Sequence, residues 1–147
     1  MSSVIEIGIS KEKGGKIISL NDVEVFKGEG IINDRKYKKN NNKEKQITLI
    51  EIENIEYYNA ISYTNFPASY FRRNLVTKNV KLNELLNKEF FIGDVKVFAH
   101  DLCRPCNYLQ KLLKKDNIVK ELLDKGGLRC EVLSSGKIYV GDLIKFN

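Results

Sequence analysis

Two cysteines stand close together in the tetrad Cys103-Arg104-Pro105-Cys106, in a setting that favours thiol chemistry. The alternation of apolar and polar residues from Val95 to Ala99 predicts a strand before the tetrad, and the leucine spacing from Tyr108 to Leu113 predicts a helix after it. The first turn of a helix offers unpaired N–H groups and a positive dipole end, which favour thiolate over thiol. Arg104 acts in the same direction. A thiolate attacks sulfur, holds a persulfide or ligates a soft metal.

Three kinds of site fit this pair of thiols, besides the simpler interpretation that they are small buried apolar residues. The first, a thioredoxin-like redox site, is excluded as a fold, because the motif follows mostly β sequence and no proline comes after Pro105. The second is a zinc site of the Cys₃His type, which would use His100, Cys103, Cys106 and Cys130. The third is a reactive thiolate beside an anion-binding surface.

Five arginines support the third kind of site, because each lies in or beside a predicted loop. They are Arg35, Arg72, Arg73, Arg104 and Arg129. Guanidinium forks suit phosphate and other oxyanions. Taken alone, each arginine is most simply a solvated surface charge. Together with the thiols, they suit a ligand that is anionic and also binds sulfur.

The composition indicates an ordinary globular domain over residues 1–147, with 42% hydrophobic and 30% charged residues. No run approaches the roughly 18 apolar residues that a membrane helix needs, and the N-terminus lacks the apolar core of a secretory signal. The odd count of three cysteines argues against a disulfide framework and for a reducing compartment. We therefore expect a cytoplasmic protein with no membrane partner.

The net charge of +6 raises a second class of function. Its densest part, Arg35-Lys36-Tyr37-Lys38-Lys39, is predicted to be an exposed loop. The alternative is therefore a basic nucleic-acid-binding module with a structural Cys₃His zinc site. Such binding would weaken steeply with salt and would ignore Cys106→Ala. Because the positive charge is spread along the chain, it counts lightly as a sign of nucleic acid.

Short strands outnumber helices along the chain. We expect strands at 4–9, 16–20, 23–26, 46–50 and 95–99, with a hairpin turn at 13–16. We expect a helix at 51–61, a helical turn around 82–86, and one or two helices from about 107 to 125, ended by Gly126-Gly127. The Gly-Asp pairs at 93–94 and 141–142 are typical of corners in a bent sheet. This order favours a mostly antiparallel β-barrel over a parallel α/β sheet.

The same segments, in this order, resemble the MOSC family, the domain named for the C-terminal part of molybdenum-cofactor sulfurases. The matching segments are Gly30 to Arg35, Lys45 to Glu51, Arg72 to Val76, Leu85-Leu86 with Phe91 to Asp94, Cys103 to Cys106, Gly126 to Arg129, and Val140 to Asp142. They span nearly the whole length and look like a short stand-alone member. The resemblance implies a mostly β fold, a closed or partly open β-barrel of MOSC type with a few short helices.

The resemblance also implies a ligand. The family's Pro-Cys pair maps to Cys106, which would carry sulfur as a persulfide or ligate the molybdenum of a bound molybdenum cofactor, a pyranopterin. The Asp-Arg and Arg-Asn segments, with two further arginines, would hold the anionic pterin ligand. These cofactor-binding candidates are Asp34, Arg35, Arg72, Arg73, Asn74, Arg104 and Arg129.

The choice between the two thiols stays open on physical grounds. The first cysteine of a Cys-x-x-Cys helix start is generally the more acidic, which favours Cys103. The resemblance favours Cys106, so we take Cys106 as the essential residue and Cys103 as assisting it. A cysteine desulfurase or a molybdoenzyme is the expected partner, and the pyridoxal phosphate associated with the family would belong to that partner. We expect cofactor binding or sulfur acceptance, with any sulfurtransferase-like activity shared with the partner, rather than a free-standing hydrolase or oxidoreductase.

Overall fold

The computed structural model describes residues 1–104 and 107–146, so Pro105, Cys106 and Asn147 lie outside the described residues. The strands are β1 (Ser3–Ile9), β2 (Ile18–Leu20), β3 (Asp22–Phe26), β4 (Gly30–Ile31), β5 (Ile47–Glu51), β6 (Leu75–Lys78), β7 (Glu89–Ile92), β8 (Val95–Leu102), β9 (Leu128–Val132), β10 (Gly136–Tyr139) and β11 (Ile144–Lys145). The helices are α1 (Ile52–Ser62), α2 (Asn107–Leu113) and α3 (Ile118–Glu121), with 3₁₀ turns η1 (Ala68–Phe71) and η2 (Leu82–Leu85).

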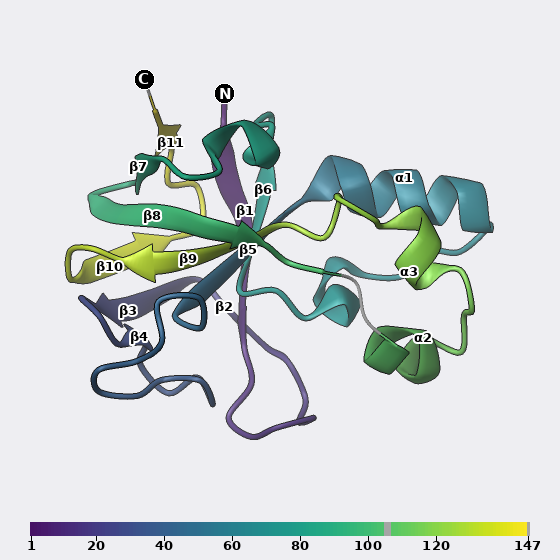
Figure 1. The fold of residues 1–147 in the computed structure, drawn as a ribbon, viewed down its shortest axis with the longest axis horizontal. Coiled ribbons are helices and arrows are strands. Elements are labelled where there is room, and N and C mark those ends of the chain that lie inside the picture. Colours follow the sequence, from purple (N-terminus) through teal and green to yellow (C-terminus); the bar gives the residue numbers. More distant parts are fainter. Residues whose placement is uncertain (105–106, 147) are drawn as a thin grey trace.

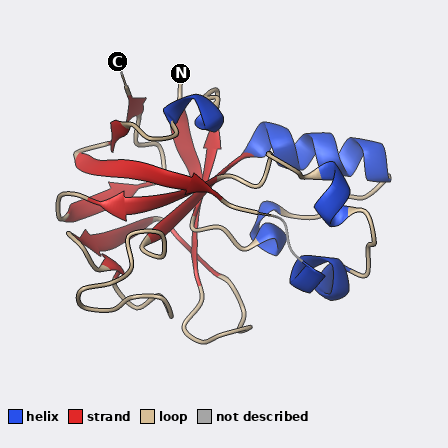
Figure 2. Ribbon diagram, viewed as in Figure 1, coloured by secondary structure: helices blue, strands red, loops and turns tan. Residues whose placement is uncertain are grey.

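Most of the strands join in one curled sheet, with the order β11-β7-β8-β9-β5-β6-β1-β2, and β10-β3-β4 form a smaller sheet. Strands β5 and β6 run parallel, because α1 carries the chain back between them, and the other paired strands of the described residues are antiparallel. Figures 1 and 2 show the strands gathered in one half of the molecule and α1, α2 and α3 in the other.

Contacts between β1 and the corner before β11 curl the larger sheet into a barrel. Ser3 forms an antiparallel bridge with Leu143, and the Val4 N–H donates to the Asp142 carbonyl at 2.9 Å. The Gly141 N–H donates in turn to the Val4 carbonyl at 2.8 Å. Since β11 pairs with β7 at the opposite edge of the sheet, these bonds bring the two ends together. The predicted mostly β, barrel-like fold is confirmed.

Apolar side chains fill two regions. The interior of the barrel holds the inward positions of each strand, such as Val97 on β8 and Val132 on β9, which alternate with outward polar ones. A second cluster packs the helices against the sheet, with Tyr58 of α1 at its centre beside Phe71 and Ile118. No helix in the described part of the chain is long and apolar enough to cross a bilayer.

The local predictions agree with the structure except near Gly126-Gly127. The helix expected at 51–61 is α1, the helical turn is η2, and β1 pairs with β2 beyond the expected turn. The glycine pair does not stop a helix, because α3 already ends at Glu121 and β9 begins at Leu128. It instead allows two segments of main chain to approach closely. A Cβ at Gly127, where φ is +102°, would lie 1.8 Å from the Leu49 carbonyl oxygen, and one at Gly126 would lie 2.4 Å from that of Cys103.

We expect Gly127→Ala to lower the free energy of unfolding by more than about 3 kcal/mol, since it combines an unfavourable positive φ with overpacking. Gly141 is the matched control, because its φ is +96° and a Cβ there would meet nothing within 4 Å. Gly141→Ala should cost only about 1–2 kcal/mol. Urea unfolding followed by circular dichroism measures both, and equal losses would show that the approach to Leu49 is unimportant.

Candidate functional site

A cavity of about 350 Å³ opens between the sheet and the loops that lead to the helices. We call it the basic cavity, and its lining residues are Arg35, Lys36, Glu44, Lys45, Thr48, Arg73, Cys103, Arg104 and Arg129. A smaller inner pocket shares several of these residues and adds Gly8, Ser10, Ile17, Asp34, Arg72 and Asn74. The structure therefore brings all the predicted site residues into two adjoining hollows, except Cys106, which lies outside the described residues.

Main-chain carbonyls hold two of the guanidinium groups. Arg73 donates from Nε to the Gly126 carbonyl at 2.9 Å and from Nη1 to the Phe71 carbonyl at 3.2 Å. Arg72 caps η1 with a left-handed φ of 62° and donates from Nη2 to the Gly15 carbonyl at 2.9 Å. Neutral carbonyls orient these groups without cancelling their charge, so both remain able to attract an anion.

Asp34 shapes the loop that carries two of the cations. Its buried carboxylate accepts the N–H of Ser10 at 3.1 Å and the N–H of Lys36 at 3.2 Å. The Arg35 N–H donates back to the Ser10 carbonyl at 2.7 Å. Through these bonds Asp34 positions the part of the loop that carries Arg35 and Lys36.

The side chain of Asn74 also forms hydrogen bonds within the protein. Its Oδ1 accepts the main-chain N–H of Thr48 at 3.1 Å, and its Nδ2 donates to the Gly8 carbonyl at 3.1 Å. The Asn74 N–H donates to the Thr48 hydroxyl at 3.0 Å. These bonds tie β5 to β1 beside the inner pocket, and they account for an asparagine directly after the two arginines.

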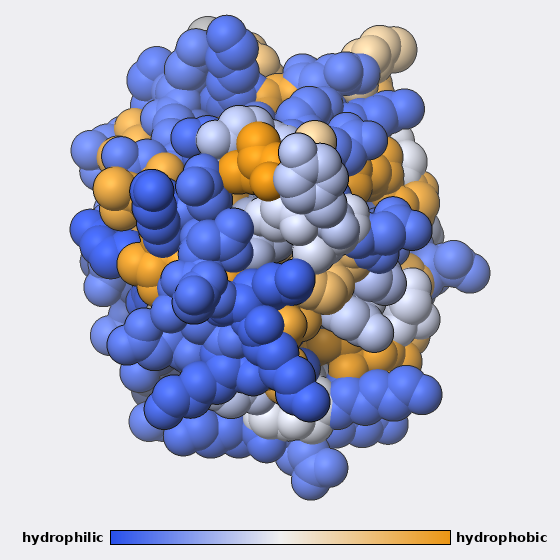
Figure 3. Space-filling view, turned by 90° about the vertical axis from the view of Figure 1, so that its right-hand side faces the viewer, coloured by the Kyte–Doolittle hydropathy of each residue, from blue (hydrophilic) through white to orange (hydrophobic). Residues whose placement is uncertain are grey.

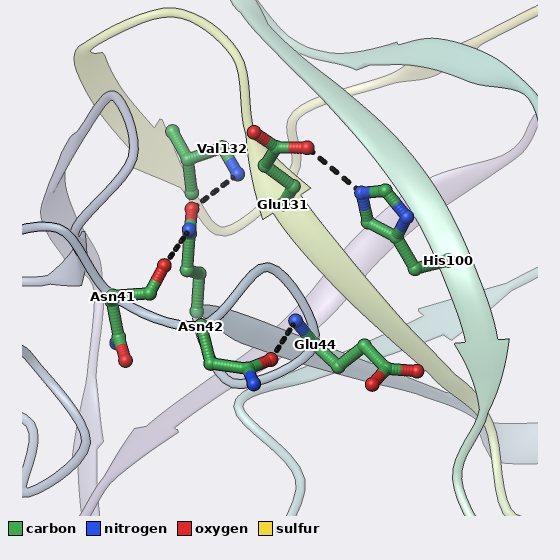
Figure 4. Close-up of polar contacts among 7 residues, drawn as sticks. Asn41, Asn42, Glu44, His100, Glu131 and Val132 are labelled. Atoms are coloured by element: carbon green, nitrogen blue, oxygen red, sulfur yellow. Dashed lines mark hydrogen bonds and ion pairs between the residues drawn. The ribbon is translucent and has the colours of Figure 1, made fainter.

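Three asparagines at 40–42 follow the basic segment 35–39, and Asn41 links it to the rest of the protein. Asn41 donates from Nδ2 to the Lys36 carbonyl at 2.7 Å and to the Glu29 carbonyl at 2.9 Å. Its own carbonyl accepts Gln46 Nε2 at 3.1 Å, and Gln46 Oε1 accepts the Val132 N–H at 2.9 Å (Figure 4). This chain of bonds fixes the loop that brings Lys36 to the cavity wall.

The first cysteine of the tetrad, Cys103, lines the basic cavity. Cys103 is buried, and its N–H donates to the Gly127 carbonyl at 2.7 Å. Next to it, Arg104 pairs with Asp101 at 3.0 Å. The N–H of Leu102 is the main group that lowers the pKa of Asp101, with Arg104 adding to the effect. The glycine pair thus holds both Cys103 and Arg73.

Positive charge dominates the cavity wall. Within the described residues, Arg104 is the one lining cation that forms an ion pair, and Glu44 is the one acidic side chain on the wall. Burial, followed by the charges of Arg35 and Arg73, lowers the pKa of Lys36. Sequence reasoning missed Lys36, Lys45 and Thr48 as lining residues, although Lys36 directly follows the Asp-Arg segment that was singled out.

A comparison with known protein families finds the MOSC domain over residues 35–145, well over half of the chain. The chain belongs to the MOSC domain family. Among solved structures, this MOSC domain is similar to the YuaD protein from Bacillus subtilis, with a TM-score of 0.80, 15% identity, and coverage of 100% of this chain and 98% of that one.

Two further solved structures are similar in fold. YiiM from Geobacillus stearothermophilus has a TM-score of 0.77 and 18% identity, over 99% of this chain and 74% of that one. YiiM from Escherichia coli has a TM-score of 0.73 and 15% identity, over 99% and 69%. At these identities the likeness concerns the fold. No curated protein sequence matches the chain.

In this MOSC domain the proposed zinc ligands face different ways. His100 points outward from β8 and pairs with Glu131 of β9, with Nε2 and Oε1 2.8 Å apart (Figure 4). Cys130 precedes Glu131 and therefore faces the opposite side of the strand, where it is fully buried in the barrel. Among the described residues there is no group of three or more candidate metal ligands. The geometry gives no support to a Cys₃His set.

We expect the affinity of the MOSC domain for sulfate to fall as the pH rises through the lowered pKa of Lys36, below 10.5. A bound dianion favours the charged lysine, so affinity is constant below that pKa and declines above it, while arginines stay charged. Titration calorimetry from pH 7 to about 10.5 measures the decline, and Lys36→Met should reduce it and lower the affinity at pH 7 about tenfold.

Lys78→Met is the control for this titration, because Lys78 is exposed at the end of β6 and outside the cavity. It should leave both the affinity and its pH dependence unchanged. An unaltered decline in the Lys36→Met protein would assign the pH dependence to another group.

Proposed function

We propose that this MOSC domain binds the molybdenum cofactor in the basic cavity and accepts or holds sulfur on Cys106. The observation that carries the proposal is the concentration of cations on the cavity wall, of which the described residues pair only Arg104 with a carboxylate. Arginines that serve only as solvated surface charges have no reason to gather around one cavity. A hollow that gathers guanidinium groups and keeps them charged fits an oxyanion such as the cofactor's phosphate.

The size and donor chemistry of the cavity fit this cofactor. About 350 Å³ lies within the roughly 300–1,000 Å³ range of small-molecule sites. Arg35 and Arg129 offer forked donors, Lys36 adds a point charge, and Thr48 adds a hydroxyl. Cys103 contributes a soft sulfur at the same wall. The residues present therefore match a ligand with both a phosphate and a centre that prefers sulfur.

The roles of the chain's own residues follow from these contacts. Arg73, fixed by two carbonyls, would orient the phosphate, and Arg35 and Lys36 would neutralise it from the loop that Asp34 holds. Cys103 would help to exclude water from its part of the wall, because its side chain is buried. When bound, the cofactor supplies a redox-active molybdenum that thiolate sulfur can ligate.

The sulfur-carrier role needs a donor, which we take to be the persulfide of a cysteine desulfurase partner. The Cys106 thiolate attacks the outer sulfur of that persulfide, a new S–S bond forms on Cys106, and the donor cysteine leaves as a thiolate. No net oxidation occurs in this exchange. The pyridoxal phosphate that releases sulfur from free cysteine belongs to the partner in this proposal.

We expect the double variant Arg35→Gln/Arg129→Gln to carry at least tenfold less cofactor than the wild type, because charge-assisted bonds to phosphate contribute about 1.5–3 kcal/mol each. The proteins are purified from a host that makes the cofactor, and bound molybdenum and pterin fluorescence are measured. The control, Lys78→Gln/Lys137→Gln, removes the same charge outside the cavity. If both double variants lost the same amount of cofactor, the loss would be due to net charge and not to the cavity. If the purified wild-type protein carried no cofactor, the binding proposal would be wrong.

Cys106→Ser should abolish sulfur loading after incubation with a cysteine desulfurase and labelled cysteine. Cys130→Ala should load normally, because burial raises the pKa of the Cys130 thiol well above its usual value and no donor can reach it. Cys103→Ser should reduce loading without removing it. Mass spectrometry of peptides locates the added sulfur, and loading that survives in Cys106→Ser would end the carrier assignment.

A further inference from the structure

A second hollow, of about 420 Å³, lies next to the inner pocket and differs from it in chemistry. We call it the apolar groove. Its lining residues are Lys16, Ile17, Ser69, Tyr70, Arg72, Leu112 and Leu113. Tyr70 and Leu112 leave 47% and 46% of their surfaces exposed, so both side chains are open to contact with a ligand in the groove.

Three separate elements build the groove. Tyr70 comes from η1, the leucines from α2, and Ile17 from the loop that precedes β2. The Tyr70 ring rests on Phe66, with centroids 5.8 Å apart and planes tilted by 34°, so one side of the ring is supported. Figure 3 shows apolar surface between charged side chains on this helical side of the molecule.

The groove and the inner pocket adjoin each other. Ile17 and Arg72 line both, and Arg72 is held at the boundary by its bond to the Gly15 carbonyl. The inner pocket in turn shares Arg35, Lys36 and Arg73 with the basic cavity. A molecule in the groove would therefore lie close to a ligand in the basic cavity, with Arg72 on the wall that the groove shares with the inner pocket.

We propose that the apolar groove binds the uncharged, planar aromatic part of a small-molecule substrate and presents it to the basic cavity. The Tyr70 ring and the Arg72 guanidinium are flat groups that stack on aromatic faces, and Leu112 and Leu113 supply apolar contact. The volume is that of a small-molecule site. The presentation to a reacting group rests on the proposed function, whereas the binding of the aromatic ring does not.

The test uses benzamide, which is planar, aromatic and uncharged, and cyclohexanecarboxamide, which has the same size but a puckered ring. Each is titrated into the full chain, and leucine methyl shifts are followed by ¹H–¹³C NMR. Benzamide should bind at least fivefold more tightly than its saturated analogue. Leu112→Asp, on an exposed position, should abolish binding, and Tyr70→Leu should weaken benzamide at least fivefold.

The control variants are Leu123→Asp and Tyr63→Leu, because both side chains are exposed and lie outside the groove. They should bind benzamide like the wild type. Equal affinity for the two amides would overturn the aromatic specificity, and equal loss in the test and control variants would overturn the groove. Arg35→Gln/Arg129→Gln separates the two proposals, because it should lose cofactor and keep benzamide, so either result can fail without the other.

Discussion

The site depends on main-chain carbonyls that hold guanidinium groups without neutralising them. Arg73 is fixed by the carbonyls of Gly126 and Phe71, and Arg72 by that of Gly15. A carboxylate in the same places would orient the arginines equally well but would cancel the field that attracts an anion. The Gly126 carbonyl lies within reach of Arg73 because Gly126 and Gly127, which have no Cβ, let this segment pack directly against the main chain of Cys103 and Leu49. A backbone constraint therefore creates the electrostatic property of the basic cavity.

Local pattern accounts for much of the fold but not for how the segments meet. Apolar alternation and helical spacing place β5, α1 and β8 within a residue or a few of their observed bounds, because burial imposes those periods on neighbouring residues. The glycine pair at 126–127 carries the same local signal as a helix stop, yet its use depends on Leu49, far away in the sequence. A register shift in β8 between Ala99 and Asp101 similarly hides which residues face the cavity.

In the candidate site, too, local sequence predicts some residues and not others. Arg35 and Arg73 are predicted from their residue type and from the order of the MOSC-like segments, since an arginine beside a loop is a recognisable anion ligand whatever the path of the loop. Lys36 and Lys45 do not stand out from the other lysines of a basic chain. Their place on the wall follows from the bonds of the Asn41 side chain to the carbonyls of Lys36, Glu29 and Lys45, which no short pattern encodes. The ligand role of all these residues stays a prediction until binding is measured.

Cations gathered around one cavity repel one another, which lowers the free energy of unfolding of the ligand-free protein. A bound anion would relieve this repulsion, so ligand binding and folding are linked. The lowered pKa of Lys36 agrees with this, because burial, followed by the charges of Arg35 and Arg73, disfavours its ammonium form. Between that pKa and 10.5 the unfolded chain binds more protons than the native one, so the contribution of Lys36 to stability rises with pH.

A bound dianion has the opposite effect on Lys36, because it favours the ammonium form. It also stabilises the fold by mass action, by about 2.7 kcal/mol at a hundred times its dissociation constant. The proposed anionic ligand would therefore stabilise the domain, and the carbonyls of Gly126 and Gly15 hold Arg73 and Arg72 in place without it.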